Sequence, residues 1–189
     1  MEQNVLYHGR PAETDGRFEK ELRVYDFLDR LGIEYDCVDT EPATTMEVCA
    51  EIDKLLAPAV ICKNLFLCNR QQTDFYLLMI KNDKKFKTKE ISGQLGVSRL
   101  SFGDASFMEE FLDIEPGAVS VMGLMNDTEN RVRLIVDEDV LQAEWFGCHP
   151  CVNTTSMRLK VADVFGPFLE AVHHEYTTVH LVGEEENEL

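Results

Sequence analysis

Apolar residues recur at the spacing of an α-helix in several parts of the chain. The first such segment ends at Gly32, a residue suited to a helix C-terminal cap, and this predicts a helix. Its apolar face consists of Phe18, Leu22, Tyr25, Leu28 and Leu31. A capping box from Thr44 to Glu47 predicts a second helix, which ends before Pro58. The apolar face of that helix consists of Val48, Cys49, Ile52, Leu55 and Leu56.

Three further helices are predicted downstream. Thr88 is expected to cap a short helix that ends at Gly96, and Asp104 is expected to cap the next. The inward residues of that second helix are Phe107, Met108, Phe111 and Leu112. Asp163 is expected to cap the last helix, where Pro167 is tolerated only near the first turn. The inward residues of the last helix are Val164, Phe165, Phe168, Leu169 and Val172.

Strand patterns occupy much of the remaining chain. Residues 33–39 alternate between apolar and acidic side chains, which predicts a half-buried strand. Val60–Cys68 and residues 75–80 are apolar runs joined by a polar turn and predict a hairpin. The second run is apolar on both faces, so we expect it to be central in a sheet. Further strands are predicted at 118–122, 131–136, 152–160 and 177–182.

These elements predict a mixed α/β fold of the α+β type, with a central, largely antiparallel mixed sheet or partial barrel flanked by helices. The regular βαβ alternation of a doubly wound fold is absent from the pattern. A chain of 189 residues, 44% of them hydrophobic, is suited to one domain. We expect that domain to span 17–182, between an N-terminal extension at 1–16 and an acidic, disordered tail at 183–189.

The net charge of −17 argues against DNA and other polyanionic partners, because Lys and Arg supply most of the affinity for phosphate. One basic segment nevertheless stands out. It contains Lys84, Lys85, Lys87 and Lys89 and is either a solvated turn or a surface for RNA phosphates. Neither a leader sequence nor a membrane-length apolar run is evident, so we expect a cytoplasmic protein without membrane contact.

Lys63 occupies an unusual position within the apolar run Val60–Cys68. At the strand period of two, it shares a face with Ile61, Leu65 and Leu67. A desolvated ammonium is costly unless it is paired or its pKa shifts. Lys63 is therefore either a rim lysine whose charge reaches water, the commoner case, or a cation that lines a pocket.

The cysteines include a C-H-P-C segment at 148–151. It is similar to the C-x-x-C of thioredoxin-like oxidoreductases, but strand-like residues follow where that fold has a helix. A zinc site from Cys148, His149 and Cys151 would need a fourth ligand, from Cys62 or Cys68. We therefore expect buried structural thiols and no metal or other cofactor, with dithiol chemistry as a minor alternative.

Five short segments occur in one order along the chain. They are K-N-L-F-L at 63–67, L-G-V-S-R-L-S-F at 95–102, P-G-A-V-S at 116–120, N-D at 126–127 and H-P-C-V-N-T at 149–154. Together they resemble the YbaK/ProX family of aminoacyl-tRNA deacylases, whose fold is also inserted in some prolyl-tRNA synthetases as an editing domain. The likeness is greatest to the free-standing ProX (PrdX-type) branch and covers about residues 17–182.

The resemblance implies the YbaK/ProRS-associated-domain fold and hydrolysis of the ester of mischarged tRNA, above all alanine on proline tRNA. It implies that Lys63, with Asn64 beside it, lies against the aminoacyl carbonyl. It places His149 in the same pocket, as a general base or an orienting group. The residues implied to contact substrate are Gly117, Ser120, Val121, Met122, Gly123, Asn126, Asp127, Pro150, Asn153 and Thr154. The implied partners are the acceptor end of tRNA(Pro) and prolyl-tRNA synthetase.

Three departures from the family pattern leave the accepted amino acid open. Val121 stands where proline is usual, Ala59 where glycine often precedes the K-N pair by four, and Cys151 where leucine is common. No serine, histidine and acid set is evident, so we expect attack by water, assisted by the terminal ribose hydroxyl as the family suggests. Met122 and Leu124 are either pocket walls or ordinary core residues. An inactive module that binds tRNA or a synthetase remains an alternative.

Overall fold

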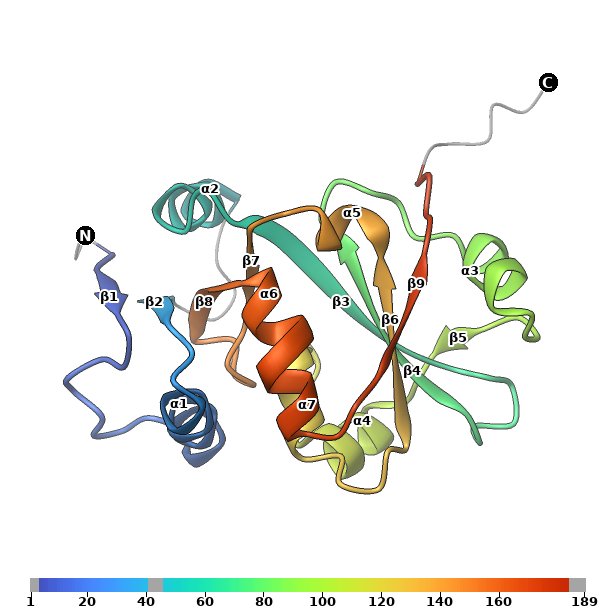
Figure 1. Ribbon diagram of the computed structural model, residues 1–189, viewed down its shortest axis with the longest axis horizontal. Coiled ribbons are helices and arrows are strands. Elements are labelled where there is room, and N and C mark those ends of the chain that lie inside the picture. Colours follow the sequence, from blue (N-terminus) through green and yellow to red (C-terminus); the bar gives the residue numbers. More distant parts are fainter. Residues whose placement is uncertain (1–3, 41–45, 184–189) are drawn as a thin grey trace.

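The computed structural model describes residues 4–40 and 46–183 and omits the side chains of 46–48. These residues form one open, nine-stranded mixed sheet with helices packed around it (Figure 1). The strands are β1 (Leu6–His8), β2 (Tyr35–Asp39), β3 (Val60–Cys68), β4 (Phe75–Lys81), β5 (Ser101–Phe102), β6 (Val132–Asp137), β7 (Trp145–Cys148), β8 (Thr155–Lys160) and β9 (Tyr176–Val179). The helices are α1 (Glu19–Leu31), α2 (Met46–Leu55), α3 (Thr88–Leu95), α4 (Ala105–Leu112), η1 (Val121–Met125), α5 (Glu138–Leu141), α6 (Val161–Asp163), η2 (Val164–Phe168) and α7 (Leu169–Ala171).

The strand order is β1-β2-β8-β7-β3-β4-β6-β9, with β5 added beside β3. Five strand pairs are antiparallel, namely β1–β2, β2–β8, β7–β8, β3–β4 and β3–β5. The pairs β3–β7, β4–β6 and β6–β9 are parallel. This confirms the predicted mixed fold with a largely antiparallel sheet. None of the helices in the described ranges is long and apolar enough to cross a membrane.

The hairpin of β3 and β4 lies at the centre of the sheet, as predicted. Its register runs from Cys62 opposite Lys81 to Cys68 opposite Phe75. Alternation divides β3 between two cores, because Phe66 and Cys68 join the largest cluster while Leu67 joins another. The hairpin therefore holds β3 rigidly from its middle to its end.

Helices cover the sheet at three places. The largest core contains Tyr25 of α1, Phe111 of α4 and Phe168 near α7, all packed against the sheet. A second core places Ile91 of α3 over β4, and a third places Ile52 of α2 against Val38 of β2. In Figure 1, α6 and α7 cross in front of the sheet while α2 and α3 lie toward opposite ends. The buried apolar area of these cores is the main source of stability.

The strand predicted at 118–122 is wrong, because η1 begins there. The Ser120 hydroxyl accepts a hydrogen bond from the Met122 amide at 3.2 Å and so starts this 3₁₀ helix. Gly117 before it has φ +92°, a conformation that favours glycine. The apolar residues of this segment are buried by a helical turn and not by a strand.

Two predicted caps are also wrong. Thr88 lies in the first turn of α3, since the Lys87 carbonyl already accepts from the Glu90 amide. The last helical segment begins at Val161, so that Asp163 lies within it. Pro167 lies inside its π-helical part, η2, where an amide five residues along, that of Leu169, donates to the carbonyl of Val164.

Other differences concern single positions. Asp104 precedes α4 as predicted, but its carboxylate accepts from Gln72 and caps nothing. Phe18 is 55% exposed just before α1, and Cys49 of α2 is exposed. The capping box predicted from Thr44 lies outside the described residues. β1, β5, β7 and α5 were not predicted, and β1 brings residues of the expected extension 1–16 into the sheet.

Candidate active site

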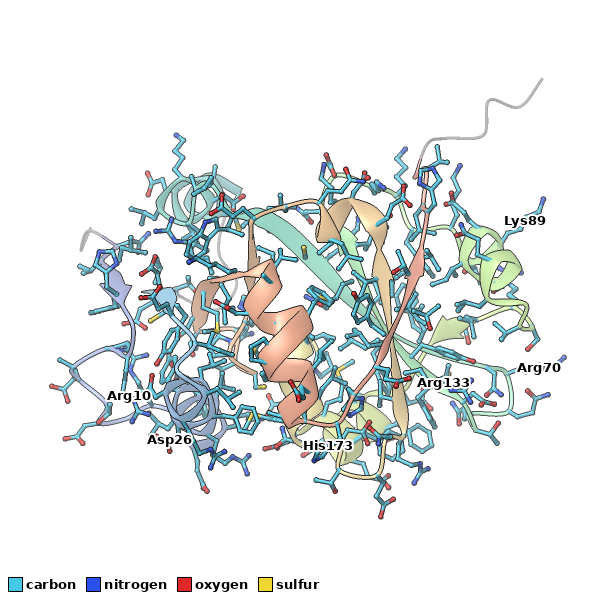
Figure 2. All side chains as sticks on the ribbon, viewed as in Figure 1. Arg10, Asp26, Arg70, Lys89, Arg133 and His173 are labelled. Atoms are coloured by element: carbon cyan, nitrogen blue, oxygen red, sulfur yellow. The ribbon has the colours of Figure 1, made fainter. Side chains whose placement is uncertain are left out.

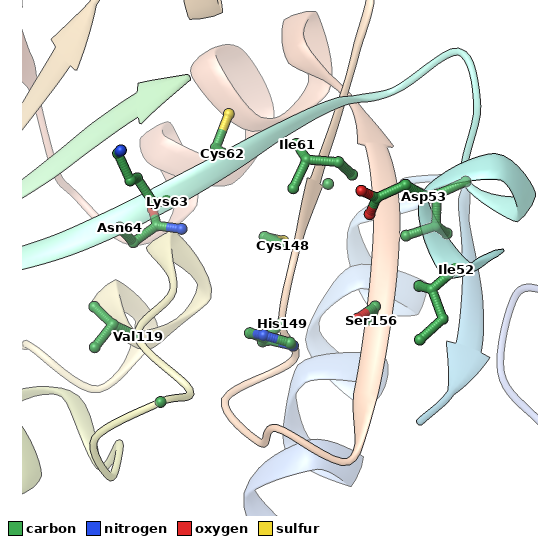
Figure 3. Close-up of a pocket in the computed structure, with 13 residues that line it drawn as sticks. Ile52, Asp53, Ile61, Cys62, Lys63, Asn64, Val119, Cys148, His149 and Ser156 are labelled. Carbon is green, nitrogen blue, oxygen red and sulfur yellow. The ribbon is translucent and has the colours of Figure 1, made fainter. Parts of the chain in front are cut away.

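A pocket opens where β3 and β7 separate. The two strands pair in parallel only at Val60 with Phe146 and Ile61 with Gly147, and beyond these positions they diverge. The cavity between them has a volume of about 290 Å³ (Figure 3). Its lining consists of Ile52, Asp53, Leu56, Ile61, Cys62, Lys63, Asn64, Gly117, Val119, Gly147, Cys148, His149 and Ser156. The pocket thus unites α2, β3, the loop before η1, and β7 and β8.

Lys63 lines the pocket from the first half of β3, ahead of the residues of this strand that are buried in the core. Its ammonium donates a hydrogen bond to the main-chain carbonyl of Asn82 at 3.2 Å. In Figure 3 the side chain extends away from His149. A single neutral carbonyl does not neutralise the charge, so a carbonyl or oxyanion of a ligand can compete for this ammonium.

Asn64 presents an unused hydrogen-bond acceptor. Its Oδ1 atom is buried and has no hydrogen-bond partner among the residues that the structure describes. Buried polar atoms in native proteins nearly always have partners, so an orphaned acceptor in a pocket points to a ligand or water that donates to it. Asn64 and Lys63 extend from opposite faces of β3. Both line the pocket, because the pocket lies along the edge of β3 that β7 leaves unpaired beyond Ile61.

His149 follows β7 and is held in one orientation. Its Nδ1 atom lies 2.8 Å from the main-chain carbonyl oxygen of Thr155. A carbonyl only accepts, so Nδ1 carries a proton, and in the neutral ring Nε2 carries the lone pair. The ring therefore offers the pocket a hydrogen-bond acceptor at Nε2.

The cysteines beside His149 are not activated thiols. Cys148 is 7% exposed at the end of a strand, and burial raises the pKa of its thiol far above the ordinary value. Burial also raises the pKa of Cys151 and of Cys62 to about 12 each. A reactive dithiol needs a lowered pKa, so these surroundings argue against the oxidoreductase alternative. Within 4–40 and 46–183, no group of three or more His, Cys, Asp and Glu side chains could hold a metal ion.

The glycine loop contributes less to the pocket than the sequence suggests. Gly117 and Val119 line it, whereas Ser120, Val121, Met122, Gly123 and Leu124 are buried in the core. Met122 and Leu124 are thus core residues, and the apolar wall expected from them is provided by Val119. A Cβ atom on Gly123 would lie 2.5 Å from Ile114 Cδ1, so close packing demands glycine there.

Asn126 and Asp127 stabilise the loop and do not line the pocket. The Asn126 amide donates to the Leu112 carbonyl at 2.8 Å. The Asp127 carboxylate accepts from the amides of Arg131 and Val132, at 2.9 and 2.8 Å. Their predicted contact with substrate is therefore not supported by their position.

The remaining residues of the 149–154 segment also lie outside the pocket lining. Pro150 is buried, and Asn153 faces a separate cavity of about 50 Å³ beside Gly117. The Thr154 carbonyl accepts from the Thr40 amide at 2.8 Å. Of this segment, His149 alone reaches the pocket.

The basic segment divides into different roles. Lys84 is 13% exposed and its ammonium lies 2.7 Å from Asp137 and 2.9 Å from Asp139, so its charge is used internally. Lys85 and Lys89 are exposed and Lys87 is half-buried. Figure 2 shows Lys89 projecting from the molecule. Lys84 is therefore not available to a surface for RNA phosphates.

Several lining residues are absent from the site predicted from the sequence. Ser156 is a polar residue close to the 149–154 segment but is not among the predicted contacts, and Ile52 and Leu56 are predicted only as part of a helix face. Asp53 of α2 directs its carboxylate toward the pocket in Figure 3, and burial raises its pKa. Asp53 lies between Ile52 and Lys54, a pattern that any amphipathic helix can show, so the sequence offered no specific signal for it.

The geometry defines a small, partly apolar pocket with a cation, a buried acceptor and an oriented imidazole on its walls. Residues 40–165 match the family model described as the aminoacyl-tRNA editing domain. The match covers most of the chain, which therefore belongs to this family of aminoacyl-tRNA and prolyl-tRNA editing proteins.

Relatives of known name agree with this assignment. The chain is 31% identical over 169 residues to prolyl-tRNA synthetase associated domain-containing protein 1 of Danio rerio, covering 88% of this chain and 89% of the relative. It is 29% identical over 137 residues to the prolyl-tRNA editing protein ProX of Acetoanaerobium sticklandii, covering 72% and 83%. A solved structure of a candidate trans-editing enzyme for prolyl tRNA synthetase superposes with a TM-score of 0.63 at 15% identity, covering 87% and 99%. That last likeness shows the fold.

Proposed function

We propose that this protein is a trans-editing deacylase that hydrolyses the ester of mischarged tRNA, with alanine on proline tRNA as its substrate. The observation that carries the proposal is the meeting of Lys63, Asn64 and His149 in one pocket of a chain from the editing family. The names of the ProX relative and of the Danio rerio relative support a prolyl-tRNA acceptor end, and prolyl-tRNA synthetase as a further partner.

The pocket contains the groups that ester hydrolysis needs. Water attacks the ester carbonyl, and the oxygen that becomes negative requires nearby donors or positive charge. The Lys63 ammonium is the cation available on the wall, and it reaches the ester by leaving the Asn82 carbonyl. His149 Nε2 accepts a proton or hydrogen bond from the water or from the terminal ribose hydroxyl of the tRNA. No protein nucleophile takes part in this scheme.

The walls of the pocket are compatible with a small amino acid. Val119, Ile61 and Cys148 restrict the cavity, whose volume is about 290 Å³ including the space for the ester. A pocket shaped for alanine excludes the proline ring sterically, whereas a synthetase site built for proline rejects the smaller alanine by only ~1–3 kcal/mol per methylene. A separate hydrolytic site corrects this weak discrimination.

The proposal is tested by incubating the protein with proline tRNA charged with alanine, cysteine or proline and measuring the released amino acid. We expect rapid release of alanine and stable prolyl-tRNA. Preferential release of cysteine would keep the deacylase and change its substrate. Binding of the charged tRNAs without release would instead identify an inactive binding module. If the protein shows no binding and no release, both assignments are contradicted.

A further inference from the structure

His149 is connected through Thr155 to a group of charged side chains outside the pocket, of which Glu21 is buried. The imidazole Nδ1–H donates to the Thr155 carbonyl at 2.8 Å. The Thr155 hydroxyl in turn donates to Oε1 of Glu21 at 2.9 Å, and it lies 3.4 Å from Oδ1 of Asp39. Thr155 and Glu21 are 0% and 1% exposed. Thr155 therefore links α1 to the pocket wall, with its hydroxyl bonded to Glu21 and its carbonyl bonded to His149.

Glu21 is a buried carboxylate that accepts three hydrogen bonds through Oε1. It accepts from Nη1 of Arg17 at 2.7 Å and from the Tyr25 hydroxyl at 2.8 Å, in addition to the Thr155 hydroxyl. Arg17 also donates to both carboxylate oxygens of Asp39, at 2.9 and 2.8 Å. A buried charge is costly unless its partners are well placed, so Glu21 depends on the donors around it.

Thr155 lies at the end of the paired region between β2 and β8. Thr155 is the first residue of β8 and pairs with Asp39, the last residue of β2. Strand ends fray more readily than strand centres because fewer neighbours hold them. The hydroxyl bond to Glu21 adds a restraint from the side of α1, besides the main-chain bond from the Thr40 amide to the Thr154 carbonyl.

We infer that Glu21 and Thr155 are positioning residues that lock His149 in the tautomer with the proton on Nδ1 and the lone pair on Nε2. The consequence for catalysis rests on the proposed function, because it requires that Nε2 accept a proton or hydrogen bond during hydrolysis. With Thr155 loosened, the proton can move to Nε2, and the ring then presents a donor where the reaction needs an acceptor.

The tautomer is read directly by ¹⁵N NMR of the histidine rings in the full-length protein, independently of activity. In the wild type, His149 should show a protonated Nδ1 and an unprotonated Nε2 at pH 8. A wild-type ring with its proton on Nε2 would overturn the inference without any variant. This measurement also remains decisive if no deacylation is found, so the two proposals fail separately.

Variants then test the role of the hydroxyl. Thr155→Val removes it at nearly constant volume, and we expect a mixture of tautomers and a kcat lower by about 10- to 100-fold with little change in KM. Thr155→Ser should restore both the wild-type spectrum and kcat. Thr178→Val, on the exposed part of β9, is the matched control. An unchanged tautomer in Thr155→Val would show that strand pairing alone holds the carbonyl, and would remove Glu21 and Thr155 from this role.

Thr155→Val leaves Glu21 with one hydrogen-bond donor fewer, so the stability of this variant is checked by urea unfolding. Glu21→Gln serves as the second variant, because it keeps a side-chain carbonyl oxygen for the Thr155 hydroxyl while removing the charge. We expect its spectrum to resemble that of the wild type more closely than that of Thr155→Val. A loss of the Nδ1–H tautomer in Glu21→Gln but not in Thr155→Val would contradict the inference that Glu21 acts on His149 through Thr155.

Discussion

The ammonium of Lys63, in β3, donates to the main-chain carbonyl of Asn82, the residue that follows β4, at 3.2 Å. This bond engages the charge with a neutral acceptor and holds the ammonium away from His149 (Figure 3). A developing oxyanion is a stronger acceptor than a carbonyl, so the interaction that Lys63 can make strengthens as the reaction proceeds. Such a difference between ground state and transition state is what accelerates a reaction.

Replacing Lys63 with alanine is expected to lower the rate of alanine release by at least ~10²-fold. The effect should fall mainly on kcat, because the charge is used most in the transition state. Single-turnover kinetics with alanyl-tRNA(Pro) provide the measurement. Lys81→Ala is the matched control, since Lys81 lies on β4 opposite Cys62 and pairs with Asp83 outside the pocket lining. Equal rates for Lys63→Ala and the wild type would remove Lys63 from the mechanism.

Replacing Val119 with alanine should enlarge the pocket and weaken its discrimination against larger residues. We expect the ratio of alanine to proline release to fall about tenfold, in the range that one or two methyl groups provide. Met122→Ala is the contrasting variant, because Met122 is fully buried in the core. It should cost ~2–5 kcal/mol of stability and leave the ratio unchanged. The reverse result would make Met122 the wall.

The thiols should react according to burial. Cys49 is exposed, whereas burial raises the pKa of Cys151 and of Cys62 to about 12 and that of Cys148 further. The thiolate is the reactive form, so at pH 8 we expect iodoacetamide to modify Cys49 first, and Cys148 and Cys151 only after unfolding. Mass spectrometry over time measures this order. Rapid alkylation of Cys148, or a reversible disulfide with Cys151, would restore the dithiol alternative.

Lys84 should matter for stability and not for catalysis. Its ammonium pairs with Asp137, which is 0% exposed, and with Asp139. Lys84→Met leaves a buried carboxylate without its cation and is expected to cost ~3–5 kcal/mol in urea unfolding. Lys89→Met, at an exposed position, should change stability by less than ~0.5 kcal/mol.

The pH dependence of the Lys84 effect follows from two pKa shifts. Burial alone would lower the pKa of Lys84, but its bonds to Asp137 and Asp139 outweigh burial and raise it. Its contribution is therefore complete at neutral pH and is lost only as the pH rises through this raised pKa. The bond from Lys84 lowers the pKa of Asp139, so that part of the stability is lost as the pH falls through the lowered value. The difference between wild type and Lys84→Met should thus be constant from pH 6 to 9 and decrease in acid.

The sequence determined the elements whose pattern is local. The alternation in β3 and β4 and the helical period that ends at Gly32 are set by neighbours a few residues apart, and the structure confirms them. The structure of short elements depends on their tertiary surroundings and was not determined by the local pattern. The segment at 118–122 is apolar in either a strand or a 3₁₀ helix, and the bond from Met122 to Ser120 decided in favour of the helix.

The sequence also supplied Lys63, Asn64 and His149, because their motifs are short and ordered along the chain. Only the tertiary structure decided which other residues accompany them. The pocket exists because β3 pairs with β7 over two positions and then diverges, which brings Asp53, Val119 and Ser156 to its walls. The bond between Thr155 and Glu21 joins residues 134 positions apart. No local pattern encodes such a contact, since it depends on how the packed sheet and α1 close on each other.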